Sequence, residues 1–99
     1  MIKITDIAAK KMNELIDEKR IPQSAMLRIS FGGFGWGGPT LQVTLDESKN
    51  RNDVLIETQG IKIVYEADLK NYVRDSIIDY SKNWFNKGFV LIQATPSAC

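Results

Sequence analysis

Several chemically important residue types are rare or missing in this chain. Histidine is absent, and Cys99 is the single cysteine. The lack of histidine removes the commonest general base near neutral pH and all imidazole metal ligands. A lone cysteine excludes an intramolecular disulfide, which is typical of a reducing compartment. No apolar run approaches about 18 residues, so we expect no membrane-spanning helix.

The chain also has almost no net charge. Lys and Arg number 13 against 12 for Asp and Glu, a net charge of +1. This balance argues against a broad basic face for nucleic acid or anionic lipid. Polar residues interrupt the N-terminus at once, which is unlike a signal peptide, so the expected location is the cytoplasm. The length predicts a single domain, residues 1–95, followed by a loose C-terminal tail, residues 96–99.

What the chain does have is a glycine-rich segment, residues 31–39, that reads Phe-Gly-Gly-Phe-Gly-Trp-Gly-Gly-Pro. It holds five of the seven glycines. Such density indicates a backbone that visits positive φ or passes very close to other atoms. Its aromatic rings are unlike a flexible linker, which is polar.

The glycine-rich segment formally matches the Gly-x-Gly-x-x-Gly pattern of dinucleotide-binding loops. That pattern needs a helix directly after it, because the pyrophosphate sits on the amides of the helix N-terminus. Here Pro39 and an alternating strand pattern follow, so we reject dinucleotide binding. A backbone-amide nest for a smaller anion stays open.

Periodicity predicts a mainly β fold with an N-terminal helix (α+β), built as a compact sandwich or pseudo-barrel of short strands. The helix covers about residues 5 to 19, with Thr5 as its N-cap. A second, short helix covers 67–74 with Leu69, Tyr72 and Val73 facing inward. The expected strands are 26–31, 40–45, 54–58, 61–65, 76–80 and 89–93. Gln59 and Gly60 form the turn of a hairpin. The apolar residues at helical spacing near the N-terminus are Ala8, Met12, Leu15 and Ile16, with Ile7 beside them.

Acidic residues offer little for catalysis. Residues 46–53 are polar throughout, and we interpret their acids as belonging to a solvated turn. An enzyme would have to rely on Asp46, Glu47, Asp53 or Asp79. Their spacing does not pair any two as a general acid and base.

The aromatic residues and the cysteine each leave two interpretations open. Trp36 either folds over the core as a lid or contacts a partner, where tryptophan is enriched. Trp84 and Phe85 leave the same choice. Cys99 is either a plain free thiol or a ligand for iron, which thiolates bind well.

Six short motifs, in order along the chain, resemble the HesB-like family, the A-type iron–sulfur carriers. The resemblance covers about residues 2 to 93. The motifs are Ile4-Thr5-Asp6 with Ala8-Ala9, Leu27-Arg28-Ile29, Gly35-Trp36-Gly37-Gly38, Gly60-Ile61-Lys62-Ile63-Val64, Ile78-Asp79-Tyr80 and Gly88-Phe89.

The resemblance implies a HesB-like domain that binds iron or an iron–sulfur cluster and is not an enzyme. In that family three cysteines hold the metal, one in the glycine loop and two in a C-terminal Cys-x-Cys, often between subunits. In this chain Trp36 stands at the loop position, and Cys99 is the one candidate ligand that matches.

Three functional hypotheses follow. The first is a divergent binding or adaptor module in iron–sulfur cluster assembly, with a homodimer, a higher homo-oligomer or assembly proteins as partners. The second is a protein-interaction module that has lost metal binding. The third, ranked last, is an enzyme that uses the acids named above. In the first two, the contact surface is the interaction loop formed by Phe34, Gly35, Trp36, Gly37 and Gly38.

Overall fold

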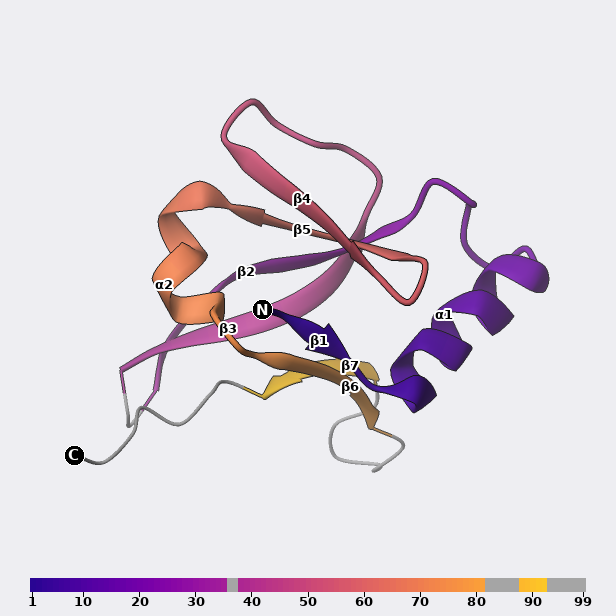
Figure 1. Ribbon diagram of the computed structural model, residues 1–99, viewed down its shortest axis with the longest axis horizontal. Coiled ribbons are helices and arrows are strands. Elements are labelled where there is room, and N and C mark those ends of the chain that lie inside the picture. Colours follow the sequence, from indigo (N-terminus) through magenta and orange to yellow (C-terminus); the bar gives the residue numbers. More distant parts are fainter. Residues whose placement is uncertain (36–37, 82–87, 93–99) are drawn as a thin grey trace.

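Two β-sheets face each other across the core in the computed structural model of the chain. The structure describes residues 1–35, 38–81 and 88–92, and for 33–35 and 38–39 it describes the backbone alone. The four-stranded sheet lies above the three-stranded sheet in Figure 1, with α1 at one end and α2 at the other. The elements are β1 (Lys3–Ile4), α1 (Asp6–Asp17), β2 (Met26–Gly35), β3 (Gly38–Asp46), β4 (Asp53–Thr58), β5 (Ile61–Glu66), a 3₁₀ turn (Ala67–Leu69), α2 (Lys70–Val73), β6 (Ile77–Ser81) and β7 (Gly88–Ile92).

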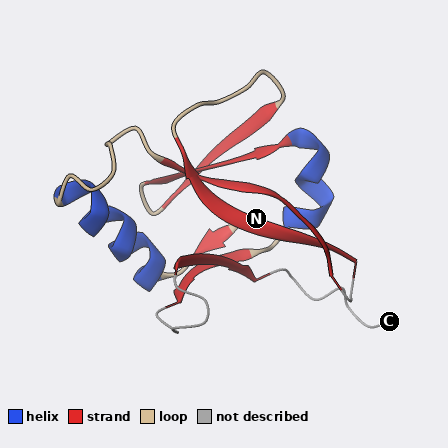
Figure 2. Cartoon of the chain, turned by 180° about the vertical axis from the view of Figure 1, so that it is seen from behind, coloured by secondary structure: helices blue, strands red, loops and turns tan. Residues whose placement is uncertain are grey.

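Both sheets are mixed. The larger has the order β3-β2-β5-β4, in which β2 pairs antiparallel with β3 and parallel with β5. The smaller has the order β1-β6-β7, with β1 parallel to β6. Figure 2 shows the same two layers from behind. The predicted fold class, mainly β with an N-terminal helix, is therefore confirmed.

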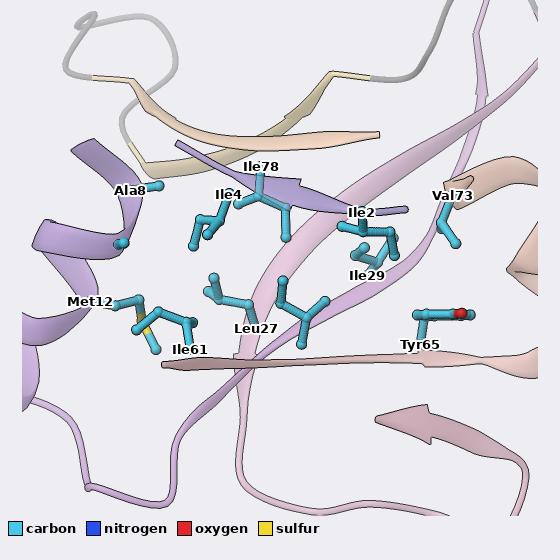
Figure 3. Packing of buried hydrophobic residues seen from close by; sticks show 12 residues of the cluster. Ile2, Ile4, Ala8, Met12, Leu27, Ile29, Ile61, Tyr65, Val73 and Ile78 are labelled. Carbon is cyan, nitrogen blue, oxygen red and sulfur yellow. The ribbon is translucent and has the colours of Figure 1, made fainter. Parts of the chain in front are cut away.

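The core fills the space between the sheets and under α1. Figure 3 shows Leu27 and Ile61 from the large sheet facing Ile4 and Ile78 from the small one, with Met12 of α1 closing the end. Met12 is 1% exposed, and Leu27 and Ile78 are fully buried. Each such aliphatic side chain contributes about 1.5–3 kcal/mol of favourable transfer free energy.

The first helix begins and ends at recognisable caps. Thr5 Oγ1 accepts a hydrogen bond from the Ala8 amide at 3.2 Å, as predicted for an N-cap. The helix ends at Asp17, two residues before the expected end. The Lys19 amide donates to the Ile16 carbonyl and the Arg20 amide to the Leu15 carbonyl. These two bonds, with Lys19 at φ 59°, form a Schellman motif that stops the helix before Pro22.

The hairpin of β4 and β5 follows the prediction closely. Thr58 pairs with Ile61, leaving a two-residue turn. Gln59 has φ 51° and Gly60 has φ 77°, as a type I′ turn requires at both central positions. Gln59 Nε2 also donates to the Ile4 carbonyl at 2.7 Å, which ties this turn to β1 of the other sheet.

One inward-facing prediction is wrong. Tyr72 is 50% exposed, whereas Val73 is 1% exposed. The single α-helical turn aligns Leu69 with Val73, four residues on, and leaves Tyr72 at its edge. Ile7, which was expected beside the apolar stripe of α1, is 59% exposed. Ala9, which the predicted stripe did not include, is buried, with 5% of its surface exposed.

Candidate functional site

The glycine-rich segment forms the far end of a long hairpin of β2 and β3. Phe34 pairs with Pro39, and Gly35 with Gly38. Both strands therefore reach further into the segment than expected. Figure 1 shows this end of the hairpin on the α2 side of the molecule, away from α1. Trp36 and Gly37 lie outside the described residues, so both interpretations of Trp36 stay predictions.

A strand, not a helix, follows the glycines. β3 begins at Gly38 and continues to Asp46. A dinucleotide loop needs the amides of a helix N-terminus at this point. The arrangement supports the rejection of the Gly-x-Gly-x-x-Gly match made from sequence.

A β-bulge at Gly32 marks the start of the glycine-rich segment. The register shifts between Phe31, which pairs with Leu41, and Gly33, which pairs with Thr40. A Cβ built on Gly32 would lie 3.5 Å from Gln42, an ordinary contact, and the φ of Gly32 is not positive. The expectation of a positive φ or a very close approach is therefore wrong for Gly32. The bulge itself twists and bends the strand there. Phe31 is 47% exposed beside it.

The other end of the hairpin is held by an ion-pair cluster centred on Arg28. Arg28 Nε lies 2.6 Å from Asp46 Oδ2, and Nη2 lies 2.7 Å from Asp53 Oδ2. A third bond joins Nη1 to Asp53 Oδ1 at 3.2 Å, and Nη2 also donates to the Ser48 carbonyl at 3.0 Å. The cluster thus connects the start of β2 with the end of β3 and the start of β4.

The cluster is well shielded from water and shifts the acidity of its members. The side chain of Arg28 is 13% exposed and that of Asp53 is 0% exposed. The hydrogen bond from Arg28, helped by the Ser48 and Glu47 amides, lowers the pKa of Asp46 from 3.8 to about 2. The pKa of Asp53 is lowered by Arg28 and by the Asn50 amide. The pKa of Arg28 is raised, first by its bond to Asp53.

These contacts correct the interpretation of residues 46–53 as a merely solvated turn. Asp46 Oδ1 accepts from the Glu47 amide at 2.7 Å, and Asp53 Oδ2 accepts from the Asn50 amide at 2.7 Å. The two acids therefore organise the turn from inside. The signal that could have revealed them is Arg28 itself, the one charged residue of β2.

The remaining acids stand apart from this cluster. Asp79 accepts a hydrogen bond from Thr5 Oγ1 at 2.8 Å on the small sheet. Glu47 accepts from Ser24 Oγ at 3.2 Å. Asp46 and Asp53 are brought together, but both bind the same guanidinium. Their lowered pKa values keep both carboxylates charged, which does not favour proton transfer.

The described part of the chain holds no group of three or more acid, cysteine or histidine side chains that could bind a metal. Cys99, the predicted ligand, lies outside the described residues, as do Trp84 and Phe85. The predicted tail, residues 96–99, lies outside them too.

None of the helices that the structure describes is long and apolar enough to cross a membrane.

Comparison with solved structures identifies the fold. The chain is similar to the solved structure of IscA with its [2Fe-2S] cluster, with a TM-score of 0.76 over 98% of this chain and 88% of that chain. The sequence identity is 22%, so this likeness shows the fold alone. The chain matches no profile of a known protein family.

Sequence relatives then give the family. The chain is 33% identical over 90 residues to the iron-sulfur cluster insertion protein ErpA of Alcanivorax borkumensis, covering 91% of this chain and 75% of that protein. It is 36% identical over 90 residues to the protein of that name from Colwellia psychrerythraea, covering 91% of this chain and 79% of that protein. The chain belongs to the HesB-like family of A-type iron–sulfur carriers, as the motifs predicted. These relatives are named as cluster insertion proteins and not as enzymes.

Proposed function

We propose that this chain is a non-enzymatic binding or adaptor module of iron–sulfur cluster assembly. The observation that carries the proposal is its 33% identity, along 91% of its length, to a cluster insertion protein. The Arg28 cluster supports it, because those acids hold the fold together and are not free for acid–base catalysis.

The iron or iron–sulfur cluster would be the cargo of the module, and Cys99 is the only thiol that could hold it. Thiolates are the preferred protein ligands of such clusters, which need four of them or their equivalents. One thiolate per chain cannot complete that set. We therefore propose that any cargo is shared between two or more copies through their tails, residues 96–99, or is completed by ligands from outside.

The hairpin would present the second contact of the module. Its base is fastened by Arg28, about seven residues, or about 23 Å of strand, from Gly35. A fastened base lets the interaction loop Phe34, Gly35, Trp36, Gly37 and Gly38 meet a partner without the strands shifting register. The partner would be a second copy or a cluster assembly protein, in the cytoplasm, and neither nucleic acid nor a membrane.

Anaerobic reconstitution with iron and sulfide tests the cargo. Native protein, Cys99→Ser and the control Ser97→Ala would be compared by visible absorption spectrum and iron content per chain. We expect a charge-transfer band in the native protein and in Ser97→Ala, and its loss in Cys99→Ser. A band that survives in Cys99→Ser would show that Cys99 is not the ligand. A colourless native protein would overturn the cargo proposal.

A second candidate function, an interaction module that has lost metal binding, is favoured by Trp36 at the position where the resemblance places a cysteine. Trp36→Ala would then abolish binding to purified cluster assembly proteins or to a second copy. Leu55→Ala is the matched control, because Leu55 is an exposed apolar residue on β4, 43% exposed. Circular dichroism would check that both variants fold. Equal binding by Trp36→Ala and native protein would contradict this function.

A further inference from the structure

A small cavity opens between the two sheets beside α2. Its volume is about 250 Å³. The apolar part of its wall comes from Ile2 next to β1, Ile56 on β4 and Val73 on α2. Figure 3 shows Ile2, Val73 and Tyr65 around this side of the core. The cavity is thus a continuation of the core that the sheets and α2 leave unfilled.

Tyr65 brings a polar group to this apolar wall. Tyr65 lies on β5 and is 8% exposed. Its hydroxyl forms no hydrogen bond with any residue that the structure describes. The hydroxyl oxygen is also not among the fully buried polar atoms that lack a partner. In Figure 3 its oxygen lies on the Val73 side, away from Leu27. A tyrosine hydroxyl that is this deeply placed usually has a partner. Tyr65 is one of the residues that line the cavity.

Met1 and two cations, Lys70 and Arg74, complete the lining. Lys70 and Arg74 stand four residues apart, so they share one side of the turn that α2 forms. Among the described residues, neither is within ion-pair distance of a carboxylate. The neighbouring acid, Asp75, forms its ion pair with the amino group of Met1. Like charges at this spacing repel, and an anion between them would relieve the repulsion.

We propose that this cavity binds a small monocarboxylate with a short apolar chain. The carboxylate would bind the Arg74 guanidinium, the Lys70 ammonium and the Tyr65 hydroxyl, since charge-assisted bonds of this kind are the strong ones. The apolar chain would lie against Ile2, Ile56 and Val73. A water takes up about 30 Å³ in the liquid, so the volume suits about eight non-hydrogen atoms. Hexanoate has that size. The proposal does not depend on cluster binding.

Titration of the native chain with hexanoate, followed through backbone amide NMR shifts, tests the proposal. We expect saturable shifts centred on Ile2, Ile56, Tyr65 and Val73. 1-Hexanol, which lacks the charge, should bind about tenfold more weakly, and hexylammonium should not bind. Shifts that do not saturate up to about 50 mM hexanoate would overturn the proposal. So would saturable shifts elsewhere, or equal binding of hexanoate and 1-hexanol.

Variants separate the polar contributions. Tyr65→Phe keeps the ring and removes the hydroxyl, and Lys70→Gln or Arg74→Gln removes one cation. Each should weaken hexanoate binding by about tenfold and leave 1-hexanol binding unchanged. Lys62→Gln, an exposed cation on β5 outside the cavity, is the matched control and should bind as the native chain does. Equal losses in Lys62→Gln would assign the effect to overall charge and overturn the site.

Discussion

Arg28 and Asp53 form a two-pronged ion pair, with Nη1 to Oδ1 at 3.2 Å and Nη2 to Oδ2 at 2.7 Å. The two residues belong to β2 and β4, which are not neighbours in the sheet, because β5 lies between them. In the register, Arg28 pairs with Val64 of β5, and Val64 is fully buried on the face opposite the core. Arg28 and the buried Val64 are therefore neighbours on the outer face of the large sheet.

Removing the charge of Asp53 should destabilise the chain strongly. Asp53→Asn leaves Arg28 with a buried guanidinium that has lost its main partner, which is costly. We expect the midpoint of thermal unfolding to fall by about 10 °C or more, followed by circular dichroism. Asp46→Asn should have a smaller effect, since the side chain of Asp46 is 33% exposed. Glu66→Gln is the control, because Glu66 pairs with Asp53 in the register but is exposed. A loss for Glu66→Gln as large as that for Asp53→Asn would contradict the prediction.

The same cluster should make stability depend on pH in the acid range. The folded-state pKa of Asp46 is about 2, below its ordinary 3.8, so the unfolded chain takes up protons first as the pH falls. The stabilisation is complete above about pH 4 and is lost progressively towards pH 2. Urea unfolding at several pH values would measure this. In Arg28→Met the pKa of Asp46 should return towards 3.8. The slope of the free energy of unfolding against pH should then become smaller. An unchanged slope in Arg28→Met would show that other carboxylates cause it.

Gly60 and Gly32 should respond very differently to alanine. Gly60 has φ 77°, a conformation that costs an alanine about 1–2 kcal/mol. Gly32 has no positive φ, and its Cβ would meet Gln42 at 3.5 Å, an ordinary contact. Gly60→Ala should therefore lower the free energy of unfolding by about 1 kcal/mol or more, and Gly32→Ala should leave it within about 0.5 kcal/mol. Chemical denaturation measures both, and the reverse order would contradict the structure.

Replacing Ser76 with alanine should stabilise the folded chain. Its side chain is fully buried, and its Oγ has no hydrogen-bond partner in the described part of the chain. Its backbone carbonyl accepts from the Lys3 amide at 2.9 Å, a bond that alanine keeps. An unsatisfied buried hydroxyl costs about 1–3 kcal/mol, so Ser76→Ala should raise the free energy of unfolding by about 1 kcal/mol. A loss of stability on this change would show that the hydroxyl is satisfied in solution.

Local features of the fold were predictable because their causes are local. Thr5 caps α1 through an amide three residues away, and Gln59-Gly60 turns a hairpin whose strands flank it directly. The HesB-like family was also predictable, since its motifs occur in order along the chain. The two-residue strand β1 was not predicted, because only its parallel pairing with Ile77 and Ile78 defines it.

Some candidate sites can likewise be recognised in the sequence, and others only in the structure. The glycine-rich segment, with its interaction loop, and Cys99 stand out in the sequence by composition and rarity, and their roles stay predictions. The Arg28 cluster did not stand out, because its partners lie 18 and 25 residues away. The cavity at Tyr65 needs Ile2, Ile56 and Val73, which come from three separate parts of the chain.

The sequence by itself determined most of the elements, the family and the shortage of metal ligands, since each of these depends on neighbouring residues or on a simple count. Only the tertiary structure decided which distant charges meet. Hydrogen bonds from Arg28 make Asp46 and Asp53 the inner supports of a turn instead of solvated acids. Loop closure and sheet order determine which distant charged residues come into contact. Neither can be read from the spacing of residues along one strand.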